Sequence, residues 1–95
     1  MVKPESIIPI DYELRERELL VRRAVSDLIR TQRKSRALVL TQEKLAELSG
    51  ISFEHLNHIE NNKSGASIEV LDRIARALGF PRLSDFLALD EHQIL

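Results

Sequence analysis

Residues 52–61, SFEHLNHIEN, place several side chains that form hydrogen bonds on one side of a predicted helix. Because Leu56 and Ile59 are expected to face inward, the opposite side of the helix is left to solvent. Amide, imidazole and carboxylate groups on that side can bind base edges in the major groove of DNA, which admits a helix. The side chains on the outer side are Phe53, Glu54, His55, Asn57, His58 and Asn61.

Two of these residues, His55 and His58, have the spacing of a shared metal site on a helix. Apart from Glu54, the sequence offers no third ligand near them, and His92 lies far along the chain, so groove contacts are the better interpretation. The sequence has no Ser–His–Asp arrangement, catalytic carboxylate pair or phosphate-binding glycine loop. We therefore expect no enzyme, no catalytic residue, no metal and no cofactor.

The stretch Thr41–Lys63 provides the elements that would position this helix. Thr41 and Ser52 are predicted N-caps of two short helices. Gly50 suits the left-handed turn between them, and Ala46 is small enough for two helices to cross closely. The apolar residues expected to fix the angle are Leu45, Ile51, Leu56 and Ile59, and Leu48 is a further expected core residue.

The N-terminal third of the chain predicts an arm followed by a long helix. Residues 1–10, MVKPESIIPI, contain two prolines and no helical period, so an extended arm or a disordered tail is expected. Asp11 is the expected N-cap of a helix that ends near Lys34. The N-terminal half of this helix is expected to project from the domain. Its predicted inner face holds Leu14, Val21, Val25 and Leu28.

The C-terminal part predicts two further helices. Ser67 is an expected N-cap, and Gly79 is expected to end the helix that follows it. Pro81 is expected to open a last short helix, with residues 91–95 as a fraying tail. The domain of five helices around one core is expected to span residues 11–90.

The central motif resembles the lambda/434 repressor, Cro and Xre family of helix-turn-helix regulators over about residues 25–87. The similarity depends on Leu40-Thr41-Gln42, Leu45-Ala46, Gly50-Ile51-Ser52, Ile59-Glu60 with Lys63, and SIEVLDRIARALG. It implies an all-α, five-helix, lambda-repressor-like fold. It also implies that residues 52–61 enter the major groove of a two-fold operator as part of a dimer.

The resemblance also implies roles for individual residues. Glu60 is expected to pair with an arginine at the end of the first helix, Arg33 first and Arg30 second. Asn62 stands where the family usually has glycine. The implied DNA contacts are Thr41, Gln42, Ser52, Phe53, Glu54, His55, Asn57, His58, Asn61, Asn62 and Lys63. The implied dimer interface is Phe80, Leu83, Phe86 and Leu87, which could equally complete the core.

Charge is distributed unevenly along the chain, whose net charge is −1. Residues 41–63 contain two lysines and four glutamates, whereas Arg and Lys outnumber acids between residues 15 and 36. Phosphate contacts must therefore come largely from outside the motif, and Arg33 and Arg36 are the predicted sources.

These features predict a cytoplasmic transcriptional regulator that acts as a repressor and whose partner is double-stranded DNA. An alternative is an antitoxin that represses its own operon and binds a toxin or other protein through residues 1–20. A third is a protein-interaction module without DNA binding. No signal peptide or membrane segment is expected, since the N-terminus lacks a long apolar run.

Overall fold

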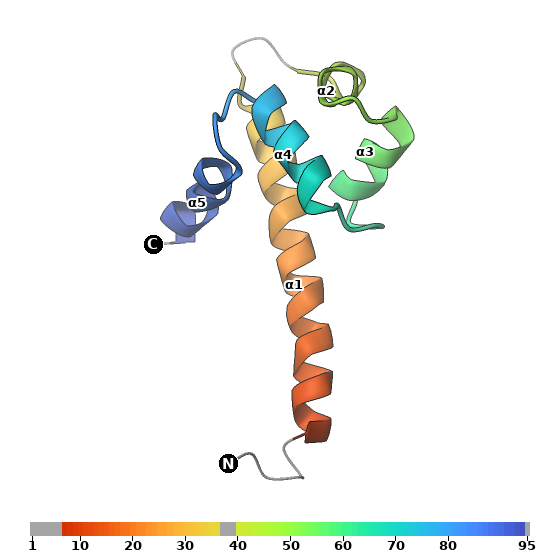
Figure 1. The fold of residues 1–95 in the computed structure, drawn as a ribbon, viewed down its shortest axis with the longest axis vertical. Coiled ribbons are helices and arrows are strands. Elements are labelled where there is room, and N and C mark those ends of the chain that lie inside the picture. Colours follow the sequence, from red (N-terminus) through yellow and green to blue (C-terminus); the bar gives the residue numbers. More distant parts are fainter. Residues whose placement is uncertain (1–6, 37–39, 95) are drawn as a thin grey trace.

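The structure, a computed structural model, describes residues 7–36 and 40–94. Over these residues it contains five α-helices and no strand, so the predicted all-α fold is confirmed. Figure 1 shows α2 to α5 gathered around the C-terminal half of α1, while the N-terminal half of α1 extends away from them. The helices are α1 (Ile7–Lys34), α2 (Gln42–Ser49), α3 (Phe53–Glu60), α4 (Ile68–Ala77) and α5 (Leu83–Ile94).

Helix α1 begins at Ile7, before the predicted start at Asp11. Residues 7–10 are therefore helical, which corrects the predicted extended arm, and Asp11 is not the N-cap. Pro9 is tolerated because it lies in the first turn, where backbone N–H groups have no acceptor within the helix. The rest of the predicted arm, residues 1–6, lies outside the described residues. No described helix, α1 included, is long and apolar enough to cross a membrane.

Side-chain caps define the starts of α2, α3 and α4 as predicted. The hydroxyls of Thr41, Ser52 and Ser67 each accept a hydrogen bond from the backbone N–H three residues later. Gly50 ends α2 at φ 71°, and Gly79 follows α4 at φ 98°. Both glycines occupy the left-handed region, where a Cβ is unfavourable.

The core lies where the helices meet α1. Its buried apolar members are Leu28, Ile29, Leu45, Ala46, Leu56, Ile59, Ile74, Ala75, Leu78 and Phe86. Ile29 was not predicted. Leu48 is 52% exposed, which corrects its expected place in the core. Leu14 and Val21 were also expected inside, but they are 50% and 56% exposed because α1 extends past the helices that cover its other half.

Helix α5 completes the core, and this limits the predicted dimer interface. Phe86 is fully buried and meets Phe80 edge to face at 5.4 Å between ring centroids. Phe80 and Leu83 are partly buried against the core. Leu87 is the most exposed of the four, at 37%. The helix continues to Ile94, so residues 91–94, expected as a fraying tail, are helical.

Candidate nucleic-acid interface

The turn between α2 and α3 has the close helix crossing that the sequence predicts. Ala46 is buried at the contact, together with Leu45 from α2 and Leu56 from α3. The N–H of Ile51 donates to the carbonyl of Ala46 at 3.1 Å, which closes the turn around Gly50. Two short helices are thereby fixed at a defined angle, and the second of them has a free outer side.

Helix α3 has one side that is buried in the domain and one side that is exposed to solvent. Leu56, Ile59 and Glu60 are buried against the domain. The outer side is open to solvent, as a surface that binds DNA requires. There Phe53, Glu54, His55 and Asn61 are exposed and Asn57 and His58 are half-buried.

Helix α1 binds the C-terminal end of α3 through three side chains. Ser26 Oγ donates to the carbonyl of Ile59 at 2.6 Å, and Arg30 Nη1 donates to the carbonyl of Glu60 at 3.2 Å. The carbonyl of Ile59 also accepts from the backbone N–H of Asn62 at 3.1 Å. The carbonyl of Glu60 is one of the last in the helix, which have no donor within it, so the bond from Arg30 satisfies a group that would otherwise need water. Both bonds from α1 also fix the direction in which α3 leaves the domain.

The third of these side chains, Arg33, pairs with the carboxylate of Glu60. Its Nε lies 2.8 Å from Oε2 and its Nη2 lies 2.9 Å from Oε1. The two side chains thus form a bidentate salt bridge, and both are almost completely buried. Arg33 Nη1 donates to the carbonyl of Leu40 at 3.0 Å. Since all three nitrogens are engaged and Arg33 is 8% exposed, it is not available to a phosphate, which corrects that part of the prediction.

A hydrogen-bond chain continues from this ion pair to the outer side of α3. Gln42 Nε2 donates to Glu60 Oε1 at 3.1 Å, and Asn57 Nδ2 donates to Gln42 Oε1 at 3.1 Å. The amide of Asn57 is therefore held in one orientation while half-exposed. The sequence named Gln42, Asn57 and Glu60 separately but gave no signal that they touch, because they lie on two different helices.

Arg36, the other predicted phosphate contact, is also occupied within the domain. Its Nη2 donates to the carbonyl of Leu78 at the end of α4, and its guanidinium lies 5.9 Å from the ring centroid of Phe80. It thus joins the segment after α1 to the segment after α4. These contacts give Arg36 a structural role, whereas the sequence predicted that it contacts a DNA phosphate.

The remaining predicted contacts surround α3. Thr41 and Ser52 are exposed, and each hydroxyl keeps its own O–H as a donor while its oxygen caps a helix. Asn61 Nδ2 donates to the carbonyl of Asn57 at 2.9 Å. Asn62 has φ 59°, and Lys63 after it is exposed. Within the part of the chain that the structure describes, no three His, Cys, Asp or Glu side chains are grouped so that they could hold a metal ion.

Comparisons with known proteins agree with this geometry. A family model described as helix-turn-helix matches residues 29–83. An uncharacterized HTH-type transcriptional regulator of Methanothermobacter thermautotrophicus is 42% identical over 64 residues, which cover 67% of this chain and 90% of the relative. The family match begins inside α1, so the N-terminal part of that helix lies outside it.

Proposed function

Because the chain belongs to the helix-turn-helix family of DNA-binding transcriptional regulators, we propose that it is a repressor that binds a two-fold operator as a dimer. In this proposal α3 enters the major groove, and the protein acts on DNA in the cytoplasm. A repressor needs only to occupy its site, which a DNA-binding domain can do.

The observation that supports this function best is the outer side of α3. Asn57 presents a half-exposed amide whose orientation is set by Gln42, and an oriented amide can bind adenine N6 and N7 together. His55 is exposed on the same helix. Phe53 is suited to a thymine methyl group and Glu54 to cytosine N4. This side therefore has groups for several different bases.

Phosphate binding must be shared among fewer cations than the sequence suggests. Arg33 and Arg36 are occupied within the domain, which leaves Lys63 next to α3. The O–H groups of Thr41 and Ser52, and the free backbone N–H groups at the starts of α2 and α3, are further donors. We therefore expect binding that depends on salt, but with a modest slope.

The test is selection of duplexes from a random library, followed by titration of the recovered site and of a scrambled duplex. We expect the recovered site to be two-fold symmetric, with two copies of the chain bound per duplex. We also expect tighter binding to that site than to the scrambled one at physiological salt. Equal affinity for both duplexes would refute sequence-specific recognition. A site without two-fold symmetry would refute the dimer.

A second candidate function is an antitoxin that represses its own operon. It is favoured by the N-terminal half of α1, which lies outside the family match and exposes Leu14, Leu19, Leu20 and Val21. The test is co-purification with the product of the adjacent reading frame. An antitoxin should bind that product, and deletion of residues 1–21, which removes all four of these side chains, should release it. Absence of binding would remove this candidate.

A further inference from the structure

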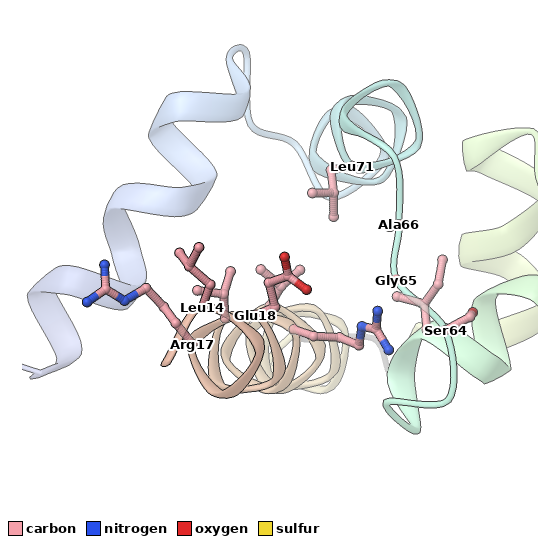
Figure 2. Close-up of a pocket in the computed structure, with 11 residues that line it drawn as sticks. Leu14, Arg17, Glu18, Ser64, Gly65, Ala66 and Leu71 are labelled. Carbon is pink, nitrogen blue, oxygen red and sulfur yellow. The ribbon is translucent and has the colours of Figure 1, made fainter. Parts of the chain in front are cut away.

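The segment that follows α3 passes α1 beside two neighbouring arginines. Arg22 lies against Gly65, since its Nε is 3.4 Å from the position that a Cβ of Gly65 would occupy. Figure 2 shows Gly65 beside α1, at a groove of about 430 Å³ that Arg22 also lines. Arg23 and Asn62 line a different hollow, whose volume is about 350 Å³. Neighbouring positions of a helix are about 100° apart around its axis, so the two arginines lie on different sides of α1.

Arg23 continues the face of α1 that binds α3. Ser26, Arg30 and Arg33 on this face donate hydrogen bonds to the C-terminal end of α3. Positions 23, 26, 30 and 33 are spaced by three and four residues, so their side chains share one side of the helix. Arg23 is three residues before Ser26, which is about 4.5 Å along the helix axis. It therefore lies beside the residues that follow α3.

Arg23 and Lys63 bring positive charge to this segment. Both residues are exposed, and Lys63 directly follows Asn62. Among the residues that the structure describes, neither forms an ion pair, although Glu16 lines the same hollow as Arg23. Asp27, four residues after Arg23, pairs instead with Arg30. Two cations are thus available here to an anion from outside the chain.

The length of α3 determines which part of DNA this segment meets. At about 1.5 Å per residue, the eight residues of α3 span about 12 Å. The major groove of DNA is also about 12 Å wide. When the N-terminal residues of α3 contact base edges, the residues after its C-terminal end come to the sugar-phosphate backbone at the edge of the groove. The anion next to Arg23 and Lys63 is then a DNA phosphate.

We propose that Arg23 binds a phosphate of the DNA backbone, next to the phosphate bound by Lys63. A guanidinium suits this ligand, because its N–H groups can bind two phosphate oxygens at once. The inference rests on the proposed function, since it requires α3 in the major groove. It extends the DNA-binding surface onto α1, at a residue that lies before the family match to residues 29–83. Arg23 thereby supplies a cation in a protein whose Arg33 and Arg36 are occupied within the domain.

The salt dependence of DNA binding by the full chain tests this role, with fluorescence anisotropy on the selected and the scrambled duplex. Arg23→Gln should weaken binding to both duplexes by the same factor and reduce the slope of log K against log salt by about one per bound copy. Arg23→Lys retains the charge and should keep the wild-type slope. Arg23→Gln/Lys63→Gln should reduce the slope by about two per copy. Circular dichroism checks the fold, which should persist because both residues are exposed.

The matched control is Arg22→Gln, which makes the same change at the neighbouring exposed arginine, on the side of the groove. It should leave the slope unchanged. Ethylation interference then locates the contact along the DNA. One phosphate whose ethylation blocks binding of wild type and of Arg22→Gln should lose this effect in Arg23→Gln.

An unchanged slope in Arg23→Gln would overturn the inference. Equal reductions in Arg22→Gln and Arg23→Gln would also overturn it, because the effect would then follow net charge and not a contact. Failure of the proposed function gives a different result. A wild type that binds both duplexes equally would refute sequence-specific recognition, whereas a slope still reduced by Arg23→Gln alone would support the phosphate contact.

Discussion

Arg33 of α1 and Glu60 of α3 share two hydrogen bonds, 2.8 Å from Nε and 2.9 Å from Nη2, in the interior of the domain. The third nitrogen of Arg33 binds the carbonyl of Leu40, just before α2. One guanidinium therefore joins three segments of the chain. Since Glu60 also accepts from Gln42, which accepts from Asn57, the pair supports the side of α3 that faces outward.

Removal of the arginine from this pair should strongly destabilise the fold. Arg33→Met leaves the buried carboxylate of Glu60 without its cation, and we expect a loss of about 3–5 kcal/mol in the free energy of unfolding. Urea denaturation followed by circular dichroism measures it. The control is Arg76→Met, which breaks an exposed pair with Asp72 at 3.2 Å and should cost less than about 1 kcal/mol. Equal losses in the two variants would contradict a stabilising role for the buried pair.

Truncation on the outer side of α3 should reduce specificity more than stability. Asn57→Ala and His55→Ala are each expected to cost about 1–3 kcal/mol on the selected site and little on a scrambled duplex. Fluorescence anisotropy on both duplexes gives the ratio. Glu69→Ala, an exposed change on α4, is the control. If both α3 variants keep the wild-type ratio, these residues do not contact bases.

Lys63 and Arg36 should differ in their effect on salt dependence. Lys63 is exposed next to α3, so Lys63→Gln should weaken binding to all duplexes and reduce the slope of log K against log salt by about one. Arg36 is bound to Leu78 and lies over Phe80, so Arg36→Gln should lower the unfolding free energy and leave the slope unchanged. A flatter slope for Arg36→Gln would restore this arginine as a phosphate contact.

Replacement of Asn62 by glycine should stabilise the fold. Asn62 has φ 59°, and its Oδ1 is buried without a hydrogen-bond partner among the described residues. Asn62→Gly removes the cost of a left-handed Cβ, and we expect a gain of about 0.5–1 kcal/mol in thermal or urea unfolding. Asn61→Gly is the matched control. Asn61 has φ −94° and donates to Asn57, so the same change there should destabilise. A loss at both positions would show that backbone strain at Asn62 is negligible.

The sequence by itself determined the helix-turn-helix. Local chemistry explains this success, because Thr41, Ser52 and Ser67 cap helices through their own neighbouring amides and Gly50 supplies a backbone angle that other residues disfavour. The sequence also predicted which side of α3 faces outward. Leu56 and Ile59 are spaced three residues apart and are buried, so the opposite side of the helix is the exposed one.

The family resemblance predicted that Arg33 pairs with Glu60, and the structure contains this pair. Only the tertiary structure decided that the pair is buried away from the DNA surface, that the carbonyl of Leu78 binds Arg36, and where α1 is covered. Leu14 and Val21 follow the same apolar period as Leu28, yet they are half exposed because none of the other described helices extends over them. Periodicity shows which side of a helix is apolar, whereas the lengths and placement of the other helices decide how much of that side is buried.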